Sequence, residues 1–106
     1  MKYKNKKTEV DGILFDSKKE ANRYQELKLL EKAGHIQHLE LQPRINLKCG
    51  DKPLLYPSGR QVFYKADFRY VENGRYVIED TKGFRTRTYK IKQAILLAMG
   101  IHITET

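Results

Sequence analysis

The sequence predicts one α/β domain in which two helices flank a largely antiparallel or mixed β-sheet. Apolar residues recur at helical spacing in two segments, residues 17–34 and 88–99. Between and after these segments lie short stretches rich in Val, Ile, Tyr and Phe, which are typical of strands. The resulting order is α-β-β-β-α-β. A chain of 106 residues is the size of a single domain, residues 1–106, with one core.

The first helix is predicted to begin near Ser17 and to end near Gly34. Ser17 and Glu20 have the spacing of a capping box, and glycine commonly follows the last residue of a helix. The side chains that recur every three residues, and that we expect to face the core, are Ala21, Tyr24, Leu27 and Leu30.

The second helix is predicted from about Thr88 to Met99, with Gly100 at its end. Its core-facing side is expected to carry Ile91, Ala94, Ile95 and Ala98. Strands are expected at residues 36–41, 61–71, 75–82 and 101–103, with 45–47 as a candidate for one more, and residues 48–60 are expected to form a loop with turns.

The dipeptide Asn73-Gly74 lies between two strand-like segments and predicts a tight hairpin. In the resulting ladder Asp67 falls directly opposite Asp80, so both carboxylates share one face of the hairpin. Lys82 projects from the same face, because it lies two residues after Asp80. Two carboxylates beside a lysine are what metal-assisted hydrolysis of a phosphodiester needs, and Mg²⁺ prefers carboxylate oxygens.

Strand alternation also selects between two neighbouring acidic residues. Glu79 is out of phase with Asp80 and is expected to point to the other face, opposite Phe68. The same hairpin has a second interpretation without chemistry. Its polar face would then be an ordinary solvent-exposed one, in which the two aspartates form salt bridges to Lys65, Arg69 and Lys82.

The net charge of +8 and the pI near 9.6 favour a polyanionic partner, of which a phosphate backbone is the commonest. Residues 1 to about 8 form a Lys-rich N-terminal arm, either a solvated terminus or a contact to DNA. No apolar run reaches the length of a membrane span, and the arm lacks the features of a signal peptide, so we expect an intracellular protein. A single cysteine, Cys49, excludes an internal disulfide.

Basic residues gather after the second strand of the hairpin and at the start of both predicted helices. They are either solvated or placed to contact DNA phosphates. The candidates for phosphate contact are Arg85, Arg87, Lys90, Lys92, Lys18 and Lys19.

Asp67 followed by Asp80-Thr81-Lys82 resembles the D…(D/E)-x-K signature of the PD-(D/E)XK nuclease superfamily. Ala66 stands where the proline that names the superfamily would be. The wider pattern is similar to a family of small phage and prophage proteins, once catalogued as a domain of unknown function and placed in that superfamily. The segments that carry the likeness are Asp11-Gly12-Ile13, Phe15 to Ala21, Arg23-Tyr24, Leu27, Ala33 to Ile36, Leu39, Leu41 to Pro43, Ala66 to Phe68 and Glu79 to Gly83.

The resemblance implies a restriction-endonuclease-like core and Mg²⁺-dependent cleavage of DNA, with Mn²⁺ able to substitute. It implies that Asp67 and Asp80 are metal ligands, that the backbone carbonyl of Thr81 is a further ligand, and that Lys82 is the catalytic lysine. Glu20 matches an acidic residue that several branches bring to the metal. The capping box explains Glu20 without any chemistry, so both roles remain open for it.

Taken together, these features lead us to expect a phage-encoded endonuclease of the Holliday-junction-resolvase kind in the bacterial cytoplasm. It would cut branched DNA in phage recombination or replication, as a homodimer whose symmetry matches two cuts. Non-specific nicking or end processing is the close alternative. A non-catalytic DNA-binding module of the same fold, and a protein whose basic face meets an acidic protein, are alternatives from other classes.

Overall fold

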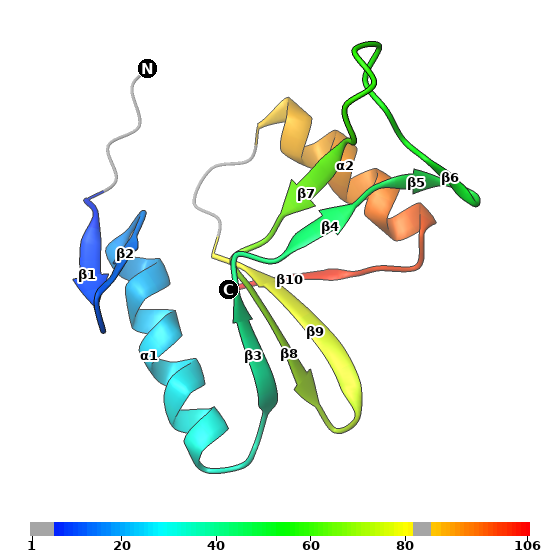
Figure 1. Ribbon diagram of the computed structural model, residues 1–106. Coiled ribbons are helices and arrows are strands. Elements are labelled where there is room, and N and C mark those ends of the chain that lie inside the picture. Colours follow the sequence, from blue (N-terminus) through cyan, green and yellow to red (C-terminus); the bar gives the residue numbers. More distant parts are fainter. Residues whose placement is uncertain (1–5, 82–85) are drawn as a thin grey trace.

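The computed structural model describes residues 6–81 and 86–106. Two helices and ten strands form in this part of the chain (Figure 1). They are β1 (Thr8–Val10), β2 (Ile13–Phe15), α1 (Lys18–Lys32), β3 (Gln37–Leu41), β4 (Arg44–Asn46), β5 (Lys48–Cys49), β6 (Lys52–Pro53), β7 (Phe63–Lys65), β8 (Phe68–Glu72), β9 (Arg75–Asp80), α2 (Arg87–Ala98) and β10 (Ile103–Glu105).

A four-stranded sheet with the order β10-β9-β8-β3 forms the centre of the molecule. Strand β10 is parallel to β9, and the other neighbours are antiparallel, so the predicted mixed sheet is confirmed. Strands β8 and β9 are joined by Asn73 and Gly74 with φ of 52° and 76°, which is a type I′ turn. Glu72 pairs with Arg75 as the turn predicts, and the ladder continues in this register to Phe68.

The predicted strand 61–71 is broken into β7 and β8 by a bend at Ala66 and Asp67. The neighbouring strand breaks at the same level, where β3 ends and Gln42-Pro43 leads into β4. Proline has no N–H for a ladder, and Gln42 has a φ of +50°, so an extended strand cannot continue there. Hydrogen bonds from Gln42 N to Asp67 O, 2.9 Å, and from Ala66 N to Pro43 O, 3.1 Å, hold the two bends together.

Two apolar clusters lie on opposite faces of β9. Val77 packs against a cluster beneath α1, whereas its neighbour Ile78 belongs to a cluster beneath α2. The α1 cluster contains Phe15, Ala21, Tyr24, Leu27, Ile36, Phe68 and Tyr70, and the α2 cluster contains Ile45, Leu47, Val62, Tyr64, Ala66, Ile78, Tyr89, Leu96 and Ile103. The alternation of a strand sends neighbouring side chains to opposite faces, so each helix covers its own side of β9.

Helix α1 has the bounds that its caps predict. Ser17 is the N-cap, and its Oγ accepts a hydrogen bond from Glu20 N at 3.1 Å. At the other end, His35 N donates to Leu30 O at 2.9 Å and Gly34 N donates to Glu31 O at 3.1 Å. These two bonds form a Schellman motif, which ends the helix where the glycine stands.

The predicted core-facing side of the second helix is confirmed at Ile95, which packs against the α2 cluster. It is wrong at Ile91, Ala94 and Ala98, which are exposed. Helix α2 buries Tyr89 and Leu96, whereas Ile91 is 55% exposed. Most of the second half of this helix is apolar on every side, so spacing alone does not define one buried face. Neither helix in the described part of the chain is long and apolar enough to cross a membrane.

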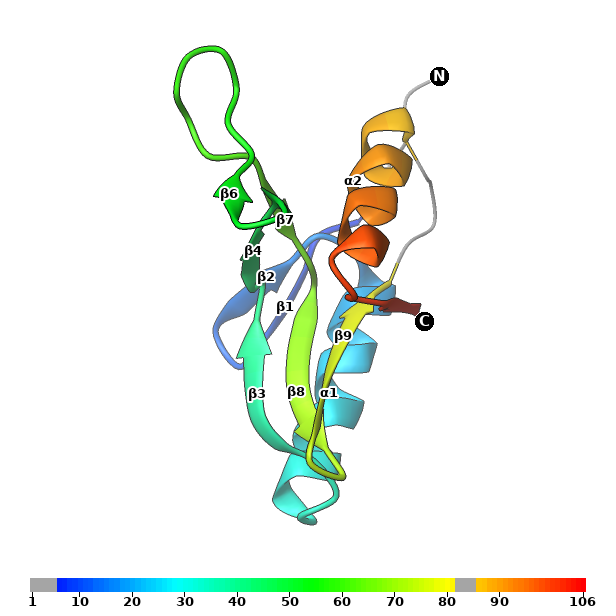
Figure 2. The same ribbon diagram turned by 90° about the vertical axis from the view of Figure 1, so that its right-hand side faces the viewer.

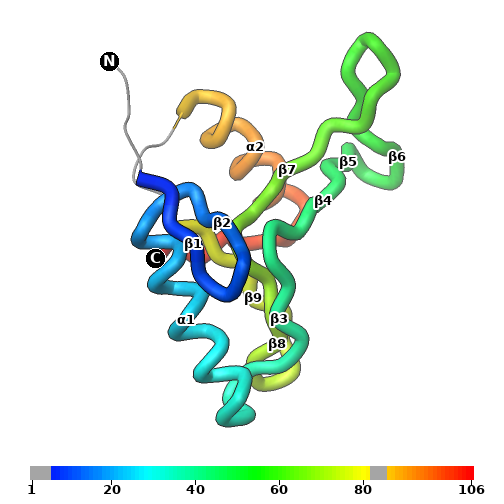
Figure 3. The backbone as a smooth tube through the Cα atoms, turned by 60° about the vertical axis from the view of Figure 1, so that its left-hand side comes forward, coloured from blue at the N-terminus to red at the C-terminus, as the bar shows by residue number. Residues whose placement is uncertain are grey.

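A short hairpin of β1 and β2 precedes α1 and was not expected from the sequence. Asp11 and Gly12 form its turn, with φ of 55° and 75°. The hairpin lies along the first half of α1 (Figure 3). Thr8 is therefore part of a strand rather than of a basic arm, while residues 1–5 lie outside the described residues. Asp-Gly between apolar residues is a hairpin signal that could have revealed it.

The segment 48–60, predicted as a loop, contains a two-residue hairpin of β5 and β6 and an isolated bridge from Leu55 to Gln61. The end of this segment projects away from the sheet (Figure 2). The radius of gyration is 15.1 Å, compared with about 13 Å for a compact domain of this length. The molecule has a flat, extended form of 41 × 41 × 21 Å, to which the projecting end of this segment contributes.

We expect Leu27→Ala to lower the free energy of unfolding by about 2–5 kcal/mol, because Leu27 lies on the buried side of α1 and is wholly buried. Leu29→Ala is the matched control on the same helix. Leu29 is 69% exposed, so its replacement should change stability by no more than about 0.5 kcal/mol. Urea unfolding monitored by circular dichroism measures both values, and equal losses would contradict the described orientation of α1.

Candidate functional site

Asp67 and Asp80 lie together where β8 begins and β9 ends. Asp80 is wholly buried, and its Oδ1 accepts a hydrogen bond from the backbone N of Asp67 at 3.0 Å. Asp67 Oδ2 in turn accepts from Thr81 N at 2.7 Å and from Thr81 Oγ1 at 3.1 Å. Each aspartate is therefore held by the backbone of the opposite strand.

This arrangement replaces the last step of the predicted ladder. Regular pairing ends at Phe68 and Glu79, and the N–H of Asp67 also lies 3.1 Å from the carbonyl oxygen of Glu79. The bend at Asp67 turns the strand before a direct pairing with Asp80 can form. Each side chain nevertheless contacts the strand end that carries the other, through bonds to Asp67 N and to Thr81.

Backbone N–H groups compensate part of the repulsion between the two carboxylates, because an ionised carboxylate is stabilised by such donors. Both side chains retain the hard oxygen atoms that Mg²⁺ prefers. Asp67 Oδ1, for example, takes part in none of the bonds formed by the described residues. Within the described ranges, no group of three or more His, Cys, Asp or Glu side chains could hold a metal ion. The pair still fits Mg²⁺, which is commonly bound by one or two carboxylates with water and phosphate.

Glu20 is buried in the first turn of α1, with 5% of its surface exposed. The Ser17 half of the predicted capping box is present. One turn further along the helix, Arg23 contacts Glu79 near the end of β9, so the start of α1 lies beside the end of that strand. The active-site role of Glu20 stays a prediction. Lys82, the predicted catalytic lysine, lies outside the described residues.

Glu79 points away from Asp80 and toward α1, as strand alternation predicts. Its carboxylate is 1% exposed and accepts two hydrogen bonds from one guanidinium, Arg23 Nε to Oε1 at 2.8 Å and Nη2 to Oε2 at 2.7 Å. The Tyr70 hydroxyl also donates to Oε2. The hydrogen bond to Glu79 raises the pKa of Arg23. Burial, and then the bond to Glu79, raise the pKa of Tyr70.

Sequence reasoning missed this buried network. The signal in the sequence is weak, because Arg23 and Glu79 are 56 residues apart and each is ordinary at its own position. A charged residue within the apolar stripe of a helix is the feature that could have suggested a buried partner.

The alternative in which Arg69 neutralises the two aspartates is wrong. Arg69 pairs with Glu40 on β3 instead, with Nη2 to Oε2 at 2.7 Å and Nε to Oε1 at 2.9 Å. The guanidinium lowers the pKa of Glu40 through this bond. Lys65, the second cation of that alternative, forms no ion pair with the residues that the structure describes.

The predicted phosphate contacts fall into three groups. Lys92 is half-buried and donates from Nζ to the carbonyl oxygen of Phe63 at 2.8 Å, so it links α2 to β7. Arg85 lies outside the described residues. The others are exposed in the first turns of the two helices and stay candidates for phosphate contact: Lys18, Lys19, Arg87 and Lys90.

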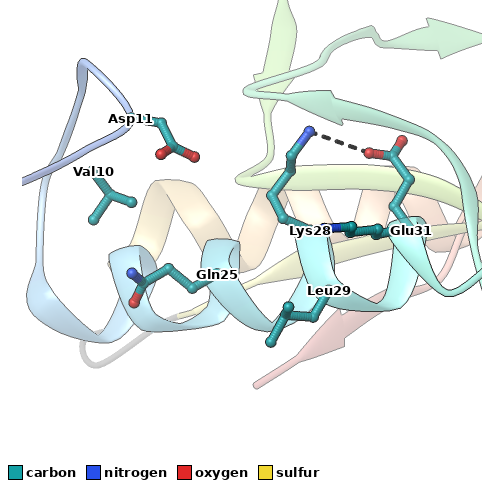
Figure 4. A pocket seen from close by; sticks show the side chains of 7 residues that line it. Val10, Asp11, Gln25, Lys28, Leu29 and Glu31 are labelled. Carbon is teal, nitrogen blue, oxygen red and sulfur yellow. Dashed lines mark hydrogen bonds and ion pairs between the residues drawn. The ribbon is translucent and has the colours of Figure 1, made fainter.

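A separate pocket lies between the β1–β2 hairpin and α1 (Figure 4). Val10 and Asp11 line one side, and Gln25 and Leu29 line the other. None of the residues lining it is a predicted site residue. The pocket is therefore distinct from the aspartate pair.

The chain belongs to the family described as "Protein of unknown function (DUF1064)", whose pattern it matches over residues 1–102. No curated protein and no solved structure matches the chain. The match covers both Asp67 and Asp80, and also Glu20 and Arg23, so the family extends over the whole candidate site.

We expect Arg23→Met to lower the free energy of unfolding by about 3–5 kcal/mol, because it leaves the Glu79 carboxylate buried without its cation. Arg69→Met is the matched control. Arg69 binds Glu40 with the same two-bond geometry, but Glu40 is 45% exposed, so the loss should stay below about 1 kcal/mol. Chemical denaturation measures both losses, and similar values would contradict the described burial of Glu79.

Tyr24 and Tyr70 are expected to ionise late in an alkaline titration. Burial raises the pKa of Tyr24 and of Tyr70 in the folded protein, and hydrogen bonds to carboxylates raise it further. A folded-state pKa above that of the unfolded chain stabilises the fold below about pH 10, and this contribution is lost as the pH rises further. The absorbance of tyrosinate against pH measures the effect.

Tyr24→Phe and Tyr70→Phe should each remove absorbance from the late part of that titration. A titration in which neither Tyr24→Phe nor Tyr70→Phe alters the late part would contradict the proposed environments.

Proposed function

We propose that this protein is a Mg²⁺-dependent DNA endonuclease whose active site contains Asp67 and Asp80. The observation that carries the proposal is the burial of Asp80 beside Asp67 at the adjoining ends of two strands. Burying an ionised carboxylate is costly unless a cation or several donors compensate it. A pair of neighbouring carboxylates that is fixed by backbone donors is a natural place for a divalent cation.

The donor set supports this proposal. Asp67 and Asp80 would hold the metal, with the carbonyl of Thr81 as a further ligand and Glu20 as an additional acid; Mn²⁺ would substitute for Mg²⁺. When bound, the metal would polarise a phosphodiester oxygen and lower the pKa of a bound water. The chain's own contribution is to hold Asp67, because Thr81 fixes one carboxylate oxygen with two hydrogen bonds. Lys82 follows as the proposed stabiliser of charge on the phosphate.

Membership of the PD-(D/E)XK superfamily, a restriction-endonuclease-like core and a phage or prophage origin are part of the same proposal. They rest on the likeness of the sequence pattern, together with the position of the aspartate pair. The mixed sheet with one helix cluster on each side of β9 is consistent with such a core.

For the substrate we propose branched DNA, cut in the manner of a Holliday junction resolvase by a homodimer. A small basic domain has little room for reading a long sequence, and a two-fold dimer supplies two equivalent active sites. Non-specific nicking is the second candidate, and the basic surface with its exposed cations favours it equally. Comparing cleavage of four-way junction, plain duplex and single strands distinguishes these substrates.

We expect Asp80→Asn and Asp67→Asn each to lower the rate of Mg²⁺-dependent cleavage by at least about 100-fold, because each removes a charged ligand. Asp51→Asn is the matched control, because Asp51 is exposed in the turn between β5 and β6. This variant should cleave DNA at the wild-type rate. Labelled DNA substrates with Mg²⁺ or EDTA provide the measurement, and circular dichroism checks folding.

Three outcomes of this experiment would change the proposal. No metal-dependent cleavage of any substrate by the wild type would refute the enzyme and favour a DNA-binding module. Cleavage of plain duplex at the same rate as four-way junction would refute the preference for branched DNA, but it would leave the nuclease proposal standing. Cleavage by Asp80→Asn at the wild-type rate would exclude the aspartate pair as the active site.

A further inference from the structure

Two cations oppose each other directly in the β4·β7 ladder. Arg44 is paired with Lys65, and the next pair along is closed by the hydrogen bond from Ala66 N to Pro43 O at 3.1 Å. Hydrogen-bonded and non-hydrogen-bonded pairs alternate in an antiparallel ladder, so Arg44 and Lys65 form a non-hydrogen-bonded pair. In such pairs the side chains approach most closely. Like charges placed in this way destabilise a sheet.

No carboxylate among the described residues relieves this repulsion. Arg44 and Lys65 are both exposed, and neither takes part in an ion pair with the described part of the chain. Residues 42–66 hold five basic residues and one acidic residue, Asp51, so this hairpin carries half of the net charge of +8. An anion from outside the chain would compensate the two cations.

The pair lies on the open face of the β4·β7 ladder. Ile45 and Tyr64 point into the α2 cluster, so alternation places Arg44, Lys65 and Phe63 on the other face. The Arg44 guanidinium carbon lies 3.9 Å from the centre of the Phe63 ring. This stacking holds the guanidinium in place before any ligand arrives, which lowers the entropy lost on binding.

The end of the β4·β7 ladder that carries Arg44 and Lys65 lies beside the aspartate pair. Lys65 precedes Asp67 by two residues, at most about 7 Å along the chain. The start of β4 is tied to the same point by the hydrogen bond from Gln42 N to Asp67 O at 2.9 Å. In Figure 1 the start of β4 and the end of β7 meet the start of β8 and the end of β9 at the centre of the molecule.

We propose that Arg44 and Lys65 bind the phosphate backbone of DNA and guide it along the open face of the β4–β7 hairpin toward Asp67 and Asp80. The inference rests on the proposed function for the identity of the polyanion. Phosphate oxygens bound between the two cations would relieve their mutual repulsion. A contact to the phosphate backbone carries no preference for DNA base sequence.

The test is Lys65→Glu, assayed in EDTA so that binding is measured without cleavage. A carboxylate opposite Arg44 should raise the melting temperature by a few degrees, because repulsion becomes attraction across the strands. The same change should weaken binding of a fluorescent DNA duplex at least about ten-fold near 0.1 M salt, and should flatten the dependence of log Kd on log salt. Stability and affinity therefore move in opposite directions, which a damaged fold cannot produce.

Lys32→Glu is the matched control, because Lys32 is exposed in the last turn of α1 and the change in net charge is the same. We expect its affinity for DNA to fall less than about three-fold. Equal weakening by the two variants would overturn the proposal, since net charge alone would then explain binding. Binding of polyglutamate by the wild type as tightly as DNA would also overturn it, in favour of an acidic protein partner.

The result is separable from that of the nuclease proposal. If the wild type cleaves DNA but Lys65→Glu binds it normally, the surface is refuted and the nuclease stands. If Lys65→Glu loses binding while the wild type shows no cleavage, the surface stands and the nuclease is refuted.

Discussion

The buried ion pair of Arg23 and Glu79 is the contact on which the rest of the structure depends. It joins α1 to β9 through two hydrogen bonds of 2.7 and 2.8 Å, and Tyr70 on β8 completes it. A carboxylate that is 1% exposed must keep its cation, because an unpaired charge in that position costs several kcal/mol. The helix therefore cannot slide along the sheet without losing this pair.

The position of Glu79 also orients its neighbour. Because successive residues of a strand point to opposite faces, fixing Glu79 against α1 turns Asp80 to the other side, where Asp67 lies. Glu79 and Asp80 are adjacent acidic residues, and either could fill the acidic position of the D…(D/E)-x-K pattern. Their different surroundings give them different roles. Glu79 is neutralised by a guanidinium and holds the fold together, whereas Asp80 is held by a backbone N–H group beside a second carboxylate.

The paired bends at Gln42-Pro43 and at Ala66-Asp67 divide the molecule into two parts. The four-stranded sheet packs against α1 on one face, and its strands β9 and β10 pack against α2 on the other face together with the β4–β7 hairpin. The aspartate pair lies at the junction of the two parts. Arg44 and Lys65, which form no ion pair with the part of the chain that the structure describes, lie within a few residues of that junction. This position connects the fold of the chain to its proposed way of holding DNA.

Local chemistry in the sequence determined much of this protein. Ser17 and Gly34 define α1, and Asn73-Gly74 defines the hairpin whose register brings Asp67 and Asp80 together, because caps and turns act over a few residues. The tertiary structure decided the buried face of α2, the break in the strand at Asp67, and the partners of Arg23 and Lys92. These features depend on contacts between segments that lie far apart in the chain, and neither periodicity nor propensity contains information on which distant residue will supply a charge or an acceptor.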